Sequence, residues 1–222
     1  MSLGSPRVHR RATGSTNDDA RALARDGAPH GALVTAGEQT AGRGRRGRSW
    51  SAVPGDALLM SIVLRDVPEL LTLRVAIAVA RACGDDTQIK WPNDVLLDGR
   101  KVAGILCEGT AGQSWAIAGI GVNTGAPPPD HPEAGGLGRD GGAIEPLLTA
   151  VLAELESALS LDERGVVEQI AARDALAGCR IDWDGGVGTA TGVDPRGRLL
   201  VDGDDGTQFA LDAGEVSLAP RS

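Results

Sequence analysis

The segment QIKWPNDVLLDGRKVAGILCEG, residues 88–109, constrains the fold more than any other part of the chain. Two apolar runs flank the pair Asp98-Gly99, and this pair in that setting predicts a tight β-hairpin. Because a hairpin joins adjacent antiparallel strands, the chain must form a sheet that is antiparallel in this region. Residues 32–39 and 57–64 also have strand character, and residues 114–123 are apolar enough for a buried strand.

Helical patterns are interspersed with these strands. Residues 15–27 predict a short capped helix, because Ser15 and Thr16 each precede an acidic residue by three positions. Residues 70–84 predict a buried helix, and two more are expected around 144–159 and 162–177. Antiparallel strands with segregated helices indicate an α+β fold. The Pro/Gly-rich stretch 124–142 is longer than a simple connecting loop, and its length and composition are typical of a mobile lid.

The character of the sequence changes at Gly178. Short strand-like runs separated by Gly/Asp turns predict a small β-barrel over residues 178–222, after a larger domain over residues 1–177. Residues 181–222 hold eight acidic residues and three arginines, so this barrel is a poor platform for nucleic acid.

Positive charge is concentrated in one place. The chain has 22 Lys and Arg against 30 Asp and Glu, a net charge of −8, yet the stretch AGRGRRGRSW at 41–50 holds four arginines. One basic loop on an acidic body fits a small, highly charged anion better than a nucleic acid. Three widely spaced cysteines, no signal peptide and no long apolar stretch predict a soluble cytoplasmic protein with no membrane partner.

The glycines of this loop match G-x-G-x-x-G only formally. Pro54 and Gly55 follow where a dinucleotide-binding helix would run, and no Walker G-K-[ST] sequence is present. Two interpretations stay open for the loop. Its backbone N–H groups and guanidinium forks can bind a polyanion, or it is a solvated basic loop. The guanidinium groups are those of Arg43, Arg45, Arg46 and Arg48.

The predicted hairpin carries a second group of polar residues. Pro92, Asn93 and Asp94 form a turn by composition, with Lys90 before it, and the hairpin brings Lys101 back towards them. Two lysines and a carboxylate therefore converge. From the residues alone, ordinary turn and edge-strand roles remain the simpler alternative.

Four motifs occur together in order: GSTN, EQTAGRGRRGRSW, KWPNDVLLDGRKVAGIL and GIGVN. In this order they resemble the biotin protein ligases, which attach biotin to a lysine of biotin-dependent carboxylases. The resemblance covers about residues 13–123, and AGEVSL near the C-terminus is similar to the end of the family's C-terminal barrel. It implies a catalytic domain similar to class II aminoacyl-tRNA synthetases and lipoate ligases over 1–177, and an SH3-like barrel over 178–222.

The resemblance also implies a two-step reaction. Biotin and ATP, with Mg²⁺, give biotinyl-5′-AMP and pyrophosphate, and a lysine of a biotin carboxyl carrier protein domain then takes the biotinyl group. By the same resemblance, the catalytic residues are Lys101, Arg43 and Asp94. The residues expected at biotin are Ser15, Thr16, Asn17, Gln39, Gly42, Arg43, Lys101 and Gly104. Those expected at ATP or the adenylate are Arg45, Arg46, Arg48, Trp50, Asn93, Lys101 and Asn123.

The chain departs from some family members at its N-terminus. Only 14 residues precede Ser15, where DNA-binding relatives carry a helix-turn-helix, so we expect no DNA binding. We expect that the chain can form a homodimer, and the motifs assign no metal ligands. Two alternatives remain. The first is a lipoate or octanoate ligase, whose acyl substrate has no ureido ring for Ser15, Thr16, Asn17 and Gln39 to bind. The second is a non-catalytic phosphate- or RNA-binding module.

Overall fold

The computed structural model describes residues 3–109, 113–212 and 216–218. Its larger sheet has seven strands in the order β1-β2-β3-β7-β6-β5-β4. Only the β1–β2 pair is parallel, so the sheet is mixed and largely antiparallel, as predicted. The strands are β1 (Arg7–Arg10), β2 (Leu33–Ala36), β3 (Ala57–Arg65), β4 (Gln88–Lys90), β5 (Asp94–Leu97), β6 (Arg100–Gly109) and β7 (Trp115–Asn123).

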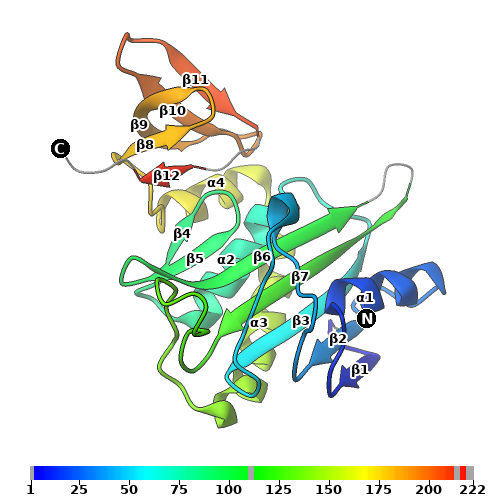
Figure 1. Cartoon of the computed structure of the whole chain (residues 1–222). Coiled ribbons are helices and arrows are strands. Elements are labelled where there is room, and N and C mark those ends of the chain that lie inside the picture. The colour runs from blue at the N-terminus through cyan, green and yellow to red at the C-terminus, as the bar shows by residue number, and fades with distance from the viewer. Residues whose placement is uncertain (1–2, 110–112, 213–215, 219–222) are drawn as a thin grey trace.

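Helices cover the two faces of this sheet unequally. On one face, α2 (Leu71–Cys83) and α3 (Ile144–Leu159) bury the large apolar core that includes Met60, Ile105 and Ile120. On the other face, α1 (Thr16–Arg25) packs a smaller cluster against Val63 and Ile117. Because α1 is short, part of that second face stays uncovered by helices (Figure 1).

The C-terminal region forms a second, antiparallel sheet with the strand order β11-β10-β9-β8-β12. Its strands are β8 (Arg180–Trp183), β9 (Gly186–Val193), β10 (Leu199–Gly203), β11 (Gln208–Leu211) and β12 (Ser217–Leu218). Within the described residues β11 and β12 are edges, and no ladder between them closes the predicted barrel. Residues 213–215 of the AGEVSL motif lie outside the described residues.

The second sheet contacts the β4–β5 end of the first sheet (Figure 1). Trp91, between β4 and β5, donates its indole Nε1 to the carbonyl of Gly197 at 2.9 Å. Helix α4 (Glu163–Ala171) leads to this junction, and Ile89 forms a parallel bridge with Asp174 just after it. The β4–β5 segment, which is part of the larger sheet, therefore also contacts the second sheet and the chain after α4.

The stretch 124–142 is fastened to the larger sheet by backbone contacts. Gly135 donates its N–H to the carbonyl of Lys101 at 2.8 Å, and Leu137 donates its N–H to the carbonyl of Asn123 at 3.0 Å. The side chain of Asn123 donates to the carbonyl of Gly135 at 3.0 Å. These contacts hold the stretch against the start of β6 and the end of β7.

Arg74 joins the two helices behind the larger sheet. Its side chain is buried, with 2% of the residue exposed. The guanidinium donates to the carbonyls of Ala158 at 3.0 Å and Leu161 at 2.6 Å, at the end of α3. It also donates to the carbonyl of Glu69 just before α2, at 2.7 Å. A positive charge at a helix C-terminus satisfies carbonyls that have no intrahelical partner.

We expect Arg74→Met to lower the free energy of unfolding by about 2–4 kcal/mol, because it leaves several buried carbonyls unsatisfied. Thermal unfolding followed by circular dichroism measures this loss. Arg164→Met, at an exposed i,i+4 pair with Glu168, is the matched control and should leave the melting temperature almost unchanged. A similar shift in both variants would contradict the role of Arg74.

Candidate active site

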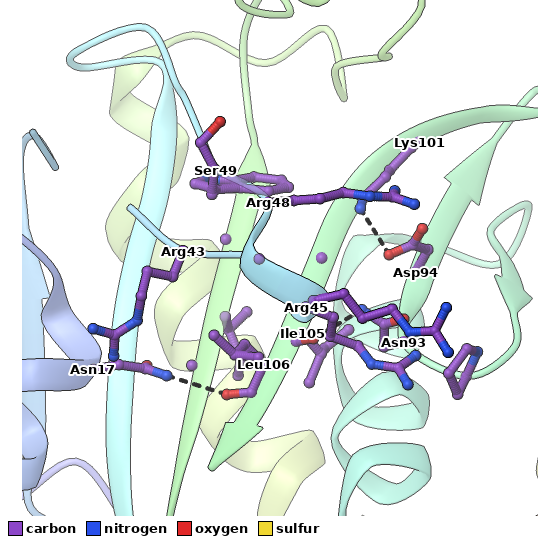
Figure 2. Close-up of a pocket in the computed structure, with 18 of the residues that line it drawn as sticks. Asn17, Arg43, Arg45, Arg48, Ser49, Asn93, Asp94, Lys101, Ile105 and Leu106 are labelled. Carbon is purple, nitrogen blue, oxygen red and sulfur yellow. Dashed lines mark hydrogen bonds and ion pairs between the residues drawn. The ribbon is translucent and has the colours of Figure 1, made fainter. Parts of the chain in front are cut away.

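A pocket occupies the face of the larger sheet that α1 leaves uncovered (Figure 2). The start of α1, the arginine-rich loop 41–50, the β4–β5–β6 hairpin and β7 all contribute to its lining. Val216 and Ser217 from the second sheet complete it. Segments from across the chain therefore converge on one site, and the loop and the hairpin face each other across it.

Glycines on adjacent strands make room for Trp50 in the floor of the pocket. The Trp50 ring lies so close to Gly121 that an added Cβ there would come within 2.5 Å of it, and within 3.0 Å at Gly104. Lys101 Nζ lies over the ring, 5.6 Å from its centroid. Larger side chains at these two positions would displace the indole, which explains why small residues interrupt the apolar strands.

A β-bulge brings Lys101 to the same face as Gly104. The register of β6 against β5 passes from Val95 opposite Ala103 to Leu96 opposite Lys101, so one residue of β6 is extra. Without the bulge, strand alternation would send Lys101 to the opposite face. Lys101 Nζ instead lies 2.8 Å from Asp94 Oδ1 in an ion pair at the pocket wall (Figure 2).

Positive charge dominates one end of the pocket. Asp94 is the one carboxylate in the described lining, and the cationic side chains at its end of the pocket are those of Arg45, Arg46, Arg48, Lys90 and Lys101, whereas Arg43 points towards Asn17 (Figure 2). Burial, with the nearby charge of Arg46, lowers the pKa of Arg45. Burial also lowers the pKa of Lys90, and Lys101 and Arg48 add to this effect. This part of the pocket is built to receive anions.

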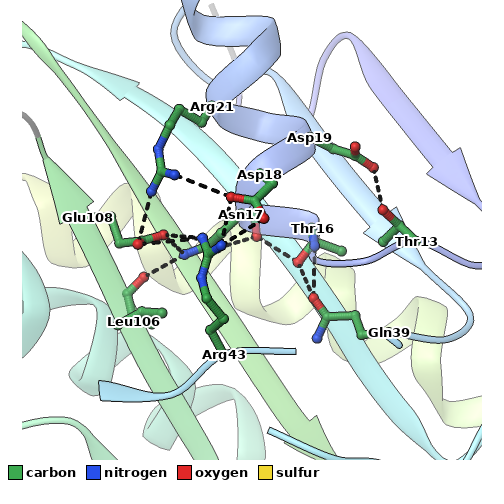
Figure 3. A network of polar contacts seen from close by, with 11 residues as sticks. Thr13, Thr16, Asn17, Asp18, Asp19, Arg21, Gln39, Arg43, Leu106 and Glu108 are labelled. Carbon is green, nitrogen blue, oxygen red and sulfur yellow. Dashed lines mark hydrogen bonds and ion pairs between the residues drawn. The ribbon is translucent and has the colours of Figure 1, made fainter. Parts of the chain in front are cut away.

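Side chains from other parts of the chain hold the loop that carries these arginines. Arg43 donates to Asp18 at 2.7 Å and to Glu108 at 3.1 Å (Figure 3). Arg45 donates to Asn93 Oδ1 at 3.1 Å, and Arg46 lies 3.6 Å from Asp184 of the second sheet. The chain reverses at Arg46, which has a φ of 55°. These contacts hold the loop along the pocket.

The other end of the pocket is lined mainly by uncharged polar side chains, and Arg43 passes beside it to reach Asp18 and Glu108. Ser15, Thr16 and Gln39 line it, and Gln39 Oε1 accepts from the Thr16 backbone N–H at 2.8 Å. Asn17 packs against Gly119, where an added Cβ would lie 2.1 Å from Asn17 Oδ1. The pocket thus joins a neutral hydrogen-bonding end to a cationic end.

The structure brings most of the predicted site residues into this lining, with two exceptions. Gly42 lies beside it, where an added Cβ would lie 2.4 Å from the Trp50 carbonyl. Asn123 is buried and donates to Gly135, away from the lining. No described residue of 124–142 lines the pocket either. The contact of Asn123 with nucleotide and the role of 124–142 as a lid stay predictions.

Several residues of the site were not predicted. Glu108 and Asp18 hold Arg43, and Val216 and Ser217 close the pocket from the second sheet. The position of Glu108 could have been predicted from the sequence, because it lies four residues after Gly104 on the same strand, and residues at an even spacing on a strand share one face. Contacts from the second sheet have no such local signal.

The lining offers little to a metal ion by itself. The described residues contain no cluster of three or more His, Cys, Asp and Glu side chains suited to a metal. Asp94 is one hard oxygen ligand, and it is already paired with Lys101. Mg²⁺ often binds through one or two carboxylates together with substrate phosphates, so the residues fit a metal that arrives on a triphosphate.

Two family models match the chain. The Biotin/lipoate A/B protein ligase family matches residues 11–124, and the Biotin protein ligase C terminal domain matches residues 184–219. The biotin--[acetyl-CoA-carboxylase] ligase of Mycobacterium tuberculosis is 37% identical over 232 residues, covering 92% of this chain and 85% of the relative. The chain belongs to the biotin protein ligase family.

Other relatives extend the comparison. The bifunctional ligase/repressor BirA of Bacillus subtilis is 41% identical over 143 residues, covering 59% of this chain. The match spans less than half of that relative, 44% of its length. The structure of the biotin protein ligase from Aquifex aeolicus in complex with biotin and ATP has a TM-score of 0.81 and 25% identity, covering 98% of this chain and 100% of that chain.

No helix in the described part of this biotin ligase family member is both long and apolar enough to cross a membrane. This agrees with the apolar runs in the sequence, which form strands and short core helices instead.

The anchoring of the loop predicts a pH dependence. Burial of Glu108 opposes its ionisation, but the Asn17 hydrogen bond and the charges of Arg21 and Arg43 hold its pKa below the usual 4.5. A carboxyl whose pKa is lower in the folded state stabilises the fold above its unfolded pKa and loses this effect as pH falls through the folded pKa.

We therefore expect the stability advantage of wild type over Glu108→Gln to be constant above about pH 5.5 and to shrink steadily below pH 4.5. Urea unfolding of both proteins between pH 3 and pH 7 measures this difference. A difference that does not change across this range would contradict the assigned state of Glu108.

Proposed function

We propose that this chain is an ATP-dependent biotin protein ligase. It joins biotin to ATP as biotinyl-5′-AMP with release of pyrophosphate, and then transfers the biotinyl group to a lysine of a biotin carboxyl carrier protein domain. Residues 1–177 are the catalytic domain, and residues 178–222 are a C-terminal domain with an SH3-like barrel fold. The cytoplasm is the compartment in which this reaction takes place.

One observation carries the proposal. A single pocket has a neutral polar end at Ser15, Thr16 and Gln39 and an end lined by five cationic side chains. Biotin has a neutral cyclic urea at one end and a carboxylate at the other, and ATP brings a polyphosphate. The two ends of the pocket therefore complement the two reactants when the biotin carboxylate points towards the arginines and lysines.

In the first step the biotin carboxylate oxygen attacks the α-phosphorus, and the bond to the β-phosphate oxygen breaks. Both reactants are anions, so their approach requires fixed positive charge. Lys101, held by Asp94 at 2.8 Å, lies between carboxylate and phosphate. Arg45, Arg46 and Arg48 bind the phosphates, Asn93 orients Arg45, and Trp50 and Asn123 contact the nucleotide. Asp94 is the carboxylate that could help to hold Mg²⁺ arriving on ATP, which would supply further neutralisation of phosphate charge.

In the second step the acceptor lysine amine attacks the acyl carbon, and AMP leaves. Gly42 and Arg43 close over the biotin tail, and the loop 41–50 keeps water from the mixed anhydride until the acceptor arrives. The stretch 124–142 assists as a lid, and the C-terminal domain helps to receive ATP and the acceptor protein. A homodimer is compatible with this arrangement.

A lipoate ligase is the second candidate, because the matching family includes lipoate ligases. The match of residues 184–219 to a biotin protein ligase C-terminal domain favours biotin. Buried hydrogen-bonding groups left unpaired by a dithiolane ring cost about 1–3 kcal/mol each, so the two ligands should differ clearly in affinity.

Exchange of labelled pyrophosphate into ATP tests the proposal. We expect exchange that requires biotin and is not supported by lipoate or octanoate. Exchange with lipoate alone would establish the second candidate, and binding of RNA without exchange would indicate a non-catalytic module.

Lys101→Ala should slow adenylation by about 10²–10³-fold, the usual effect of removing one transition-state donor. Single-turnover formation of biotinyl-AMP measures the rate. Arg100→Ala removes a neighbouring exposed cation that contacts Pro132 instead of the pocket, and is the matched control. An adenylation rate within threefold of wild type for Lys101→Ala would remove Lys101 from this role.

Replacement of Arg45, Arg46 and Arg48 by Gln should release biotinyl-AMP into solution when no acceptor is present, because the loop no longer retains the intermediate. Chromatography of the filtrate after centrifugal filtration measures the free intermediate. Arg164→Gln on the exposed side of α4 is the control. Equal release from the loop variant and the control would support a merely solvated loop.

A further inference from the structure

Ser61 lies behind the neutral end of the pocket instead of in its lining. Its residue is fully buried, at 0% exposure, on the face of β3 that α1 covers. The Ser61 hydroxyl lies 2.6 Å from Asn17 Oδ1 and 2.7 Å from Thr16 Oγ1, both in the first turn of α1. A bound ligand would meet Thr16 but not Ser61.

The orientation of Asn17 determines where the Ser61 proton goes. Asn17 Nδ2 lies 2.6 Å from Glu108 Oε2 and 3.3 Å from the Leu106 carbonyl, and both of these oxygens accept (Figure 3). Arg21 and Arg43 pair with Glu108 and keep it ionised. The amide nitrogen therefore faces β6 and Asn17 Oδ1 faces Ser61. Because a carbonyl oxygen only accepts, Ser61 donates its one proton to Asn17.

The direction of the Thr16 proton follows from that of Ser61 and from the distances. The Ser61 oxygen has only lone pairs left for Thr16, and Thr16 Oγ1 lies closer to Ser61, at 2.7 Å, than to Gln39 Oε1, at 3.0 Å, which favours donation from Thr16 to Ser61. Three contacts between oxygen atoms share the two hydroxyl protons of Ser61 and Thr16. With the Thr16 proton directed to Ser61, the longest contact, 3.0 Å between Thr16 Oγ1 and Gln39 Oε1, has no proton between its atoms. Gln39 Oε1 keeps its 2.8 Å bond from the Thr16 backbone N–H, which fixes the direction of the amide.

Two accepting oxygens therefore lie side by side in the lining of the pocket, and a ligand N–H placed against them would relieve their repulsion. A cyclic urea carries N–H donors, whereas a dithiolane ring has none. We propose that Ser61 is a positioning residue for ligand recognition: by taking the Thr16 proton, it makes Thr16 and Gln39 an acceptor pair for a ureido N–H of biotin. This inference rests on the proposed function.

The test compares biotin with its two cyclic carbamate analogues, each with one ring N–H replaced by an ether oxygen, in pyrophosphate exchange. For wild type, at least one analogue should have a KM about tenfold or more above that of biotin, the effect of one lost hydrogen bond in a buried site. In Ser61→Ala, Thr16 can donate to Gln39 instead. The KM for biotin should then rise about tenfold, with kcat within twofold, and the ratio between analogue and biotin should fall below about threefold.

Two further variants separate positioning from general stability. Ser61→Cys keeps a weak donor and acceptor of similar size and should recover part of the KM ratio between analogue and biotin. If Ser61→Ala does not fold, Ser61→Cys is compared with wild type in its place. Thr35→Ala removes another buried hydroxyl, on β2, whose partners Arg7 and His9 lie away from the pocket. Its ratio should equal that of wild type.

A wild-type KM ratio in Ser61→Ala, or in Ser61→Cys where Ser61→Ala does not fold, would overturn the role of Ser61 while leaving the proposed function intact. Absence of biotin-dependent exchange in wild type would overturn the proposed function itself, so the two failures can be distinguished.

Discussion

The concentration of positive charge in one pocket is the constraint on which the rest of the site depends. Six cationic side chains share the described lining with one carboxylate, and such a cluster repels itself unless neighbouring groups hold it. Carboxylates outside the lining offset part of this charge: Asp18 and Glu108 pair with Arg43, and Asp184 lies near Arg46. The charges nearest the hairpin stay directed into the pocket. This arrangement suits the proposed reaction, in which two anions must meet.

Glu108 connects the neutral end of the pocket to the arginine-rich loop. One of its oxygens accepts from Asn17 at the neutral end, and the same carboxylate pairs with Arg43 of the loop. The group that anchors the loop thereby also fixes the amide from which the order of hydroxyl protons follows. Ring recognition and loop position therefore depend on a shared carboxylate, and a change at Glu108 should affect both.

Much of this could be predicted from the sequence, and the failures have physical reasons. The Asp98-Gly99 hairpin and the helices 15–27 and 70–84 follow from local turn and capping chemistry, and the structure contains them. Strand β1 was missed because Arg7–Arg10 has no apolar run and pairs only at an edge. The family was predicted correctly from motifs. The contacts of Trp91 and Val216 with distant segments depend on tertiary packing, which leaves no local pattern. The closed barrel, the lid and the individual ligand contacts remain predictions.

The central claim is that the pocket offsets the mutual repulsion of a carboxylate and a triphosphate. Calorimetric titration with an unhydrolysable ATP analogue and Mg²⁺, with and without saturating biotin, tests it most directly. The account predicts that bound biotin leaves the affinity for the analogue unchanged or increases it. A decrease of tenfold or more on addition of biotin would show that the repulsion is not offset and would contradict the account.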